Sequence, residues 1–277
     1  VETGFSDLDV GKINYLDDGE HFVWISERDG YRHLYLYQTD GQFVRQISRG
    51  PWDVTDFHGI DEEQGYVYLT GTLESPLERH LYRVGLGAQS GGSETSADPV
   101  KITEAQGWHS VNMSSDTRYY IDTYSNAERP PVVRLHASDG ERLQVLEPNQ
   151  VLRERVKEYR LPVPEFTTVP AADGTELNAY IIKPNDFDPD KQYPLLMYAY
   201  GGPGSQTVMR SWGGSRYLWH AYLARTHDIL VASVDNRGTG GRGKEFKSIT
   251  YRRLGRIEAE DQIVAAQHLR KLPYVDK

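Results

Sequence analysis

A tyrosine at the head of a glycine-rich loop is the first feature of this sequence that could do chemistry. Tyr200 opens the run YGGPG at residues 200–204, directly after an apolar stretch at residues 195–199. Glycines let the backbone turn sharply with positive φ. A phenol O–H at such a turn can stabilise the oxyanion that forms when a nucleophile attacks a carbonyl carbon. The spacing alone also fits an ordinary turn beside one of nineteen tyrosines, so both interpretations stay open.

A second glycine-rich loop, DNRGTGGRG at residues 235–243, follows another apolar stretch. Its glycines satisfy G-x-G-x-x-G, and Glu258 lies near the distance at which a dinucleotide-binding fingerprint places an acidic residue. Such a fingerprint opens a helix at once, whereas the next apolar helical stripe here begins only near Ile257. The pattern therefore favours a structural loop held by Asp, Asn and Arg contacts over a phosphate loop.

The remaining ionisable residues predict structural roles, and neither a metal nor a cofactor is expected. Asp261 lies in the apolar stripe of the last predicted helix, where a carboxylate needs a partner such as Arg253. None of the nine histidines falls in H-x-x-x-H or H-E-x-x-H spacing, and His33 and His80 occupy matching places in a repeat. The run DEE at residues 61–63 could hold an amine, but its place between two strands predicts a solvated turn.

The nucleophile of an α/β-hydrolase is missing from the sequence. No serine lies in the G-x-S-x-G motif of that fold, in which the acid and the base follow the serine. All three members of a triad are therefore expected outside this chain, which alone should be inactive. The chain starts at Val1 without a methionine and stops at Lys277 just after a helical pattern, so we expect both ends to be interior positions of a longer protein.

Composition excludes several classes of protein. With 31 basic and 40 acidic residues and no run of Lys or Arg, the chain has a formal charge of −9 and lacks an electrostatic platform for nucleic acid. The absence of cysteine excludes disulfides, thiolate metal sites and a cysteine nucleophile. No apolar run approaches the roughly 20 residues of a membrane span.

The first half of the sequence predicts β-propeller blades. HLYLY at residue 33 and HLYRV at residue 80 are offset by 47 residues, and a glycine and a tryptophan recur in GPWDV at residue 50 and GWHSV at residue 107. Repeats of about 40–50 residues made only of strands are typical of propeller blades. We predict about three blades, with further blades before Val1 and a flexible loop inside one blade at residues 88–99. The predicted strands cover residues 22–26, 33–37, 66–70, 80–84, 119–122 and 132–136.

The second half changes to alternating strands and helices. Apolar residues at helical spacing predict a short helix at residues 150–159, which LPVP at residues 161–164 ends. Beyond it, the turn at residues 172–174 predicts a hairpin, and two apolar runs predict covered central strands of an open parallel sheet. The predicted strands cover residues 166–169, 177–182, 195–200 and 229–234; the predicted helices cover residues 217–226 and the stretch from Ile257 to Leu272.

Four motifs give the sequence a family resemblance. ERDGYRHLY at residues 27–35, KQYPLL at residues 191–196, YGGPGSQ at residues 200–206 and VDNRGTG at residues 234–240 together resemble the prolyl oligopeptidase family. The dipeptide LG at residues 254–255 and the residues that follow it are similar to the dipeptidyl peptidase IV branch. The motifs occur in the family's order over nearly the whole chain.

The resemblance implies a fold and a site. It implies C-terminal, all-β blades of an eight-bladed β-propeller as far as residue 148, a connecting helix and linker at residues 149–165, and an incomplete α/β-hydrolase domain at residues 166–277. It also implies that Tyr200 is the side-chain donor of the oxyanion hole, with a backbone N–H after the missing serine as the second donor. The family's glutamate pair for the substrate amino terminus lies upstream of this chain, so that role is not given to Glu62 or Glu63.

The function that the resemblance implies is that of a segment of a serine-type dipeptidyl aminopeptidase, which removes dipeptides after proline or a small residue. Peptides are then its partners, nucleic acid is not, and a homodimer stays open. A periplasmic or extracellular location is expected by family, with a cytoplasmic one still open. Two alternatives remain: an acylaminoacyl peptidase or esterase-like hydrolase of the same architecture, and a catalytically dead binding scaffold.

Overall fold

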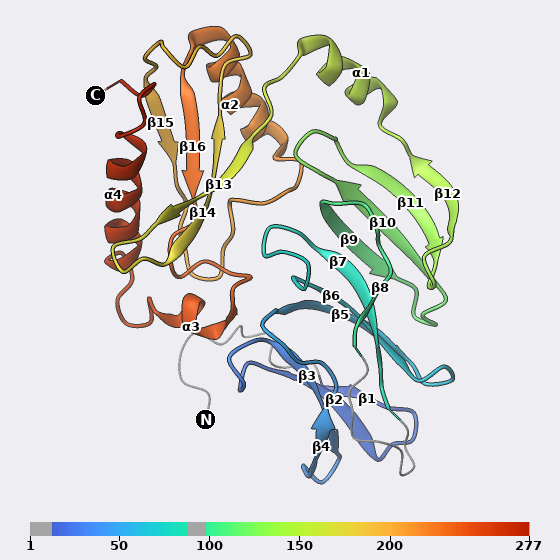
Figure 1. Cartoon of the computed structure of the whole chain (residues 1–277). Coiled ribbons are helices and arrows are strands. Elements are labelled where there is room, and N and C mark those ends of the chain that lie inside the picture. Colours follow the sequence, from blue (N-terminus) through green and yellow to red (C-terminus); the bar gives the residue numbers. More distant parts are fainter. Residues whose placement is uncertain (1–12, 88–97, 277) are drawn as a thin grey trace. The chain divides into compact units, whose positions relative to one another are not determined.

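The computed structural model describes residues 13–87 and 98–276, which divide into two units (Figure 1). No helix among these residues is long and apolar enough to cross a membrane. The predicted flexible loop at residues 88–99 lies almost entirely outside the described residues. The first unit comprises Val1–Tyr124, Val132–Pro148 and Gly241–Glu245; the second comprises Ser125–Pro131, Asn149–Gly240 and Phe246–Lys277.

Three four-stranded antiparallel sheets, each with its strands in chain order, account for most of the first unit. This simple meander is the blade of a β-propeller, so the three blades predicted from the repeat are confirmed. All six predicted strands are present. The blades consist of β1 (Asn14–Tyr15), β2 (His21–Ser26), β3 (His33–Gln38) and β4 (Phe43–Gln46); β5 (Val54–Asp61), β6 (Tyr66–Gly71), β7 (His80–Gly85) and β8 (Val100–Lys101); and β9 (Trp108–Met113), β10 (Tyr119–Ser125), β11 (Val132–Ala137) and β12 (Arg142–Glu147).

The two repeated histidines use the same hydrogen bonds in successive blades. The ring Nδ1 of His33 lies 3.0 Å from Ser48 Oγ, which itself accepts the N–H of Leu34. The ring Nδ1 of His80 lies 3.1 Å from Thr103 Oγ1, which accepts the N–H of Leu81. The Nε2 of His33 lies 2.9 Å from Gly50 O, which can only accept, so Nε2–H donates there and the Nδ1 of the neutral ring accepts the Ser48 O–H. Both histidines are therefore structural parts of the blade.

The second unit contains one mixed sheet in the order β13-β14-β16-β15. The predicted hairpin and the predicted βαβ unit are both present, but the sheet is not wholly parallel: β14 pairs antiparallel with β16, and only β15 and β16 are parallel. The difference arises because the hairpin joins the sheet directly beside β16. The elements of this unit are α1 (Gln150–Tyr159), β13 (Glu165–Pro170), β14 (Glu176–Ile182), β15 (Leu195–Tyr198), α2 (Gly214–His227), β16 (Leu230–Val234) and α4 (Ile257–Leu269), and α3 (Gly243–Ser248) has residues in both units.

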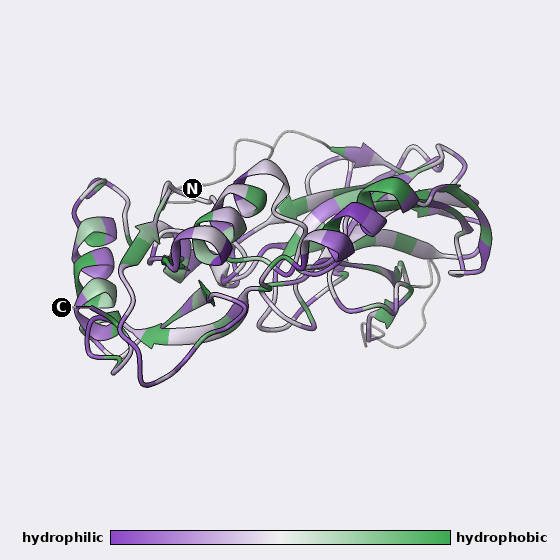
Figure 2. Cartoon of the chain, turned by 90° about the horizontal axis from the view of Figure 1, so that it is seen from above, coloured by the Kyte–Doolittle hydropathy of each residue, from purple (hydrophilic) through white to green (hydrophobic). Residues whose placement is uncertain are grey.

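Helices α2 and α4 cover opposite faces of this sheet. On β16, Ala232 packs in the same buried cluster as Ala265 of α4. Ser233 points to the other face, since side chains alternate along a strand, and it pairs in register with Tyr198, whose ring contacts His220 of α2 at 5.2 Å. Hydrophobic and hydrophilic residues alternate along α4 accordingly (Figure 2).

The two strands predicted to be covered on both faces differ in burial. Every residue of β16 is buried, as predicted. β15 is only half-buried, with Leu196 41% exposed, because it has β16 as its one partner within the described residues and so ends the sheet there. The carboxyl ends of β15 and β16 lead into the two glycine-rich loops.

Candidate functional site

Tyr200 lies two residues beyond the end of β15, at the carboxyl edge of the parallel pair. Its side chain is 71% exposed, and its phenol makes no hydrogen bond within the described residues. The next residue, Gly201, has φ +66°, and a Cβ there would come within 2.4 Å of the side-chain oxygen of Asn236. A Cβ at Gly202 would lie 2.9 Å from the Tyr200 ring. The turn therefore requires glycine at both positions, and it leaves the phenol of Tyr200 exposed at the surface.

The Tyr200 loop and the loop after β16 hold each other through backbone hydrogen bonds. The N–H of Gly204 donates to Gly238 O at 2.9 Å, and the N–H of Gly240 donates back to Ser205 O at 2.9 Å. A Cβ at Gly240 would lie 2.6 Å from Gly204 O, so the close approach requires glycine. The loop at residues 235–243 is therefore a structural partner of the Tyr200 loop.

Asp235 fixes the far end of the Tyr200 loop. Its carboxylate is buried and accepts the N–H of Thr207 at 2.9 Å and the N–H of Val208 at 3.0 Å. A carboxylate with backbone donors in a buried place is a strong and well-oriented hydrogen-bond acceptor. The loop is thus braced at both of its ends by the segment that follows β16.

Arg237 forms an ion pair with Asp261 of α4, which corrects the partner predicted from the sequence. The guanidinium Nη2 lies 2.6 Å from Asp261 Oδ1, and Nε lies 3.0 Å from Oδ2. These bonds raise the pKa of Arg237 above its usual value, against the effect of burial. The predicted partner Arg253 is exposed in the turn before α4, because Asp261 faces the end of β16 and not its own preceding turn.

The three glycines of the apparent fingerprint, Gly238, Gly240 and Gly243, all donate their peptide N–H groups within the protein. The N–H of Gly238 donates to Phe246 O, that of Thr239 to Asn236 O, and that of Gly240 to Ser205 O. Glu258, the acidic residue of the apparent fingerprint, accepts the N–H of Gly255 at the start of α4. A phosphate-binding role needs exposed N–H groups, so the G-x-G-x-x-G match is a coincidence of turn glycines.

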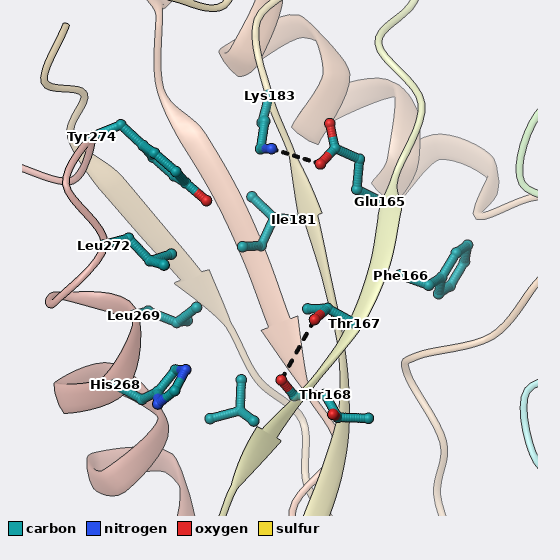
Figure 3. Close-up of a pocket in the computed structure, with 11 residues that line it drawn as sticks. Glu165, Phe166, Thr167, Thr168, Ile181, Lys183, His268, Leu269, Leu272 and Tyr274 are labelled. Atoms are coloured by element: carbon teal, nitrogen blue, oxygen red, sulfur yellow. Dashed lines mark hydrogen bonds and ion pairs between the residues drawn. The ribbon is translucent and has the colours of Figure 1, made fainter. Parts of the chain in front are cut away.

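A cavity of about 280 Å³ on the α4 side of the sheet is lined by no residue of either loop (Figure 3). Its floor is apolar, and at its rim Lys183 Nζ lies 2.6 Å from Glu165 Oε2. No residue predicted to be functional lines it. The lining residues are Glu165, Phe166, Thr167, Thr168, Val169, Ile181, Lys183, His268, Leu269, Leu272 and Tyr274.

The acidic run at residues 61–63 lines an open cavity of about 580 Å³ together with Asp17 and Asp116. Asp61 accepts the N–H of Gln64 at 2.9 Å, and Glu62 accepts the N–H of Asp17. Over residues 13–87 and 98–276, no three His, Asp or Glu side chains gather as they would around a metal ion. The predicted turn is what the structure shows at this place.

Sequence reasoning missed the residues that hold the Tyr200 loop. The sequence groups Asp235 and Asn236 only as members of a rigid loop, and nothing in it singles out Gln262. Their contacts join segments 26 to 35 residues apart, and nothing in the local pattern predicts such pairs.

Known proteins match this arrangement over nearly the whole chain. Residues 4–131 match the model of the dipeptidyl peptidase IV N-terminal region, and residues 215–277 match that of the prolyl oligopeptidase family. The probable dipeptidyl peptidase 4 of Aspergillus flavus is 34% identical over 269 residues, 96% of this chain and 34% of that protein. Dipeptidyl peptidase 4 of Trichophyton tonsurans is 31% identical over 271 residues, 98% of this chain and 34% of that protein.

Two solved structures are also similar to this chain. The crystal structure of Porphyromonas gingivalis dipeptidyl peptidase 4 superposes with a TM-score of 0.86 at 40% identity, covering 95% of this chain and 36% of that one. A putative dipeptidyl aminopeptidase IV from Bacteroides ovatus gives a TM-score of 0.78 at 30% identity, covering 95% of this chain and 39% of that one. The chain therefore spans about a third of the length of these relatives.

Propeller blades followed by the start of a hydrolase sheet, with a tyrosine loop at the sheet's carboxyl edge, define a class of serine peptidases. The chain belongs to the prolyl oligopeptidase family. Within that family, the relatives and the solved structures named above are dipeptidyl peptidases of type 4.

Proposed function

We propose that this chain is a segment of a serine-type dipeptidyl aminopeptidase and that Tyr200 is its oxyanion donor. The observation that carries the proposal is the free, exposed phenol of Tyr200 on a turn that its neighbours hold firmly. An oxyanion donor must be fixed before the reaction and must have no other acceptor to satisfy. Peptide substrates follow from the relatives, whose names are those of dipeptidyl peptidases.

In the proposed reaction, a serine oxygen attacks the scissile carbonyl carbon while a histidine takes the serine proton. The π electron pair of the carbonyl moves to its oxygen, and the Tyr200 O–H donates a hydrogen bond to the resulting oxyanion. Collapse of this intermediate breaks the C–N bond, and the histidine gives its proton to the leaving amine. Water then hydrolyses the acyl-enzyme through a second oxyanion at the same donor.

No serine of the sequence lies in a G-x-S-x-G motif, so we propose that the serine, acid and base lie outside these 277 residues and that these residues alone are inactive. We propose that the strand carrying the serine pairs with the outer edge of β15, which is unpaired within the described residues and where Leu196 is 41% exposed. An unpaired edge offers backbone donors and acceptors to a further strand. From the family we also propose that the propeller blades end at residue 148 and that the hydrolase domain begins at residue 166. We further propose that the complete peptidase cleaves after proline or a small residue, that it is exported, and that it forms a homodimer.

The decisive experiment is Tyr200→Phe in the complete peptidase, assayed with a dipeptidyl p-nitroanilide that has proline in its second position. We expect kcat to fall about 10²–10³-fold. KM should change little, because the oxyanion exists only in the transition state and the intermediates. Tyr159→Phe on α1, where the ring is 51% exposed, is the matched control. An unchanged kcat for Tyr200→Phe would remove the oxyanion assignment.

A further inference from the structure

The side-chain amide of Asn236 is buried and held in one orientation. Its Nδ2 donates to Gly201 O at 3.2 Å and to Arg237 O at 2.8 Å, and its Oδ1 accepts from Gln262 Nε2 at 3.1 Å. Asn236 is 0% exposed, so water cannot substitute for any of these partners. The reversed amide would place an oxygen against two carbonyl oxygens and an NH₂ against another NH₂ group.

Gln262 links this amide to the body of the sheet. It lies on α4, and its Nε2 donates both to Asn236 Oδ1 and to Val234 O at 2.8 Å, at the end of β16. Because both bonds use donor hydrogens of one NH₂ group, the Gln262 side chain is itself oriented by the strand. A continuous path of hydrogen bonds thus runs from β16 and α4 through Asn236 to the carbonyl of Gly201.

Gly201 is the residue that decides where Tyr200 points. The phenol has no hydrogen bond of its own within the described residues, so its position depends on the backbone that carries it. The peptide after Tyr200 enters a left-handed turn, with φ +66° at Gly201, and the carbonyl at the far side of that turn is the one that Asn236 holds. Loss of this bond would let the turn move, because a glycine backbone has more accessible conformations than that of any other residue.

We propose that Asn236 and Gln262 are positioning residues for the phenol of Tyr200. The proposal rests on the function proposed above for Tyr200 and adds to it the group that holds the donor in place. A misplacement of about 1 Å by a change away from the reacting atoms can cost about 10²-fold in rate. Asn236 acts on the turn directly, and Gln262 acts by orienting the Asn236 amide.

The test is made in the complete peptidase with the same p-nitroanilide substrate. We expect Asn236→Ala and Gln262→Leu each to lower kcat by about 10- to 100-fold with KM nearly unchanged. Gln267→Leu, an exposed glutamine on the same helix, is the matched control and should leave kcat unchanged. Gln262→Leu also covers the case in which Asn236→Ala fails to fold, because it leaves the asparagine in place.

A double-mutant cycle separates positioning from a general effect on folding. In a Tyr200→Phe background, Asn236→Ala and Gln262→Leu should cause little further loss of kcat, because the donor they position is already absent. An equal loss in both backgrounds would overturn the proposal while leaving the role of Tyr200 intact. If Tyr200→Phe itself had no effect, the proposed function would fail first, so the two failures are distinguishable.

Backbone hydrogen exchange in the complete peptidase provides a readout that does not depend on catalysis. We expect Asn236→Ala to speed exchange at the amides of Gly204 and Ser205, whose acceptors are Gly238 O and Gly202 O. The amide of Gly174, bonded to Ala171 O in the β13–β14 turn, is the internal control. Unchanged protection of Gly204 and Ser205 would contradict the proposal.

Discussion

Arg237 and Asp261 are joined by side-chain hydrogen bonds of 2.6 Å and 3.0 Å, and the backbone N–H of Arg237 also donates to Asp261 at 2.9 Å. Asp261 is 1% exposed, so water cannot solvate its charge in place of Arg237. The pair attaches the loop that braces Tyr200 to α4. The Arg237–Asp261 ion pair therefore helps to hold the loop that supports Tyr200.

The first prediction is that Arg237→Met destabilises the chain by about 3–5 kcal/mol, because it leaves a buried carboxylate without its partner. The free energy of unfolding from denaturant titration measures this. Arg256→Met is the control: the Arg256–Glu260 pair is exposed, so its loss should cost less than about 1 kcal/mol. The double variant Arg237→Met, Asp261→Leu should recover much of the loss; if it did not, the buried charge would not be the cause.

The second prediction concerns Gly201. Gly201→Ala should destabilise the chain by more than Gly174→Ala, although both glycines have positive φ, +66° and +87°. The shared cost of a left-handed alanine is about 1–2 kcal/mol. At Gly201 the new Cβ would also meet Asn236 Oδ1 at 2.4 Å, whereas nothing lies within 4 Å at Gly174. Equal unfolding free energies for the two variants would show that the Asn236 contact carries no weight.

How far the sequence predicts this fold depends on how local each signal is. The strand at residue 33 and the strand at residue 80 are found because their strand-forming residues and the repeat agree, although both strands are buried almost throughout. β5 escapes prediction because register shifts between Val54 and Asp56 and between Phe57 and Gly59 break its alternation. β12 escapes because all six of its residues are exposed, which leaves no buried face to detect.

The residues of the candidate site also differ in whether the local sequence predicts them. Tyr200 and its glycines are contiguous, so residue types and a strand before them are enough to single them out. The partner of Asp261 is 24 residues away on another element, and local spacing favoured Arg253 instead of Arg237. Pairs of this kind are set by the packing of α4 on the sheet, which a single sequence does not reveal.

The third prediction is a pH dependence that originates in buried histidines. Burial lowers the pKa of His33, His58 and His80 in the blades, and of His220 on α2, from the usual value of 6.5. The unfolded chain then binds more protons than the folded one below that value, so stability is complete above about pH 6.5 and falls as the pH is lowered towards the depressed pKa values. Each histidine contributes at most about 1.4 kcal/mol per pH unit in this range.

Denaturant titrations from pH 8 to pH 5 measure this slope. His33→Gln removes one titrating ring and should make the loss of stability with acid shallower, although it lowers stability at pH 8 through the lost bonds to Ser48 and Gly50. His227→Gln is the control, because that ring is exposed at the end of α2. A slope that His33→Gln leaves unchanged would place the acid sensitivity elsewhere.

The last prediction tests the tryptophan of the sequence repeat. Trp52 is 3% exposed, its Nε1–H donates to Arg49 O at 2.8 Å, and its ring lies 5.0 Å from that of His33 and 6.2 Å from that of Tyr82. The ring thus connects the first blade to the second. Trp52→Ala should cost about 3–5 kcal/mol, the usual loss for a large buried aromatic side chain.

Trp219→Ala on α2 is the control for Trp52→Ala, since its ring is 56% exposed and contacts mainly Tyr222. Exposed positions of this kind usually change stability by no more than about 0.5 kcal/mol. The free energy of unfolding of the two variants distinguishes the outcomes. If Trp52→Ala cost no more than Trp219→Ala, the recurring tryptophan would not stabilise the contact between blades, and the recurrence of glycine and tryptophan in the sequence would need another explanation.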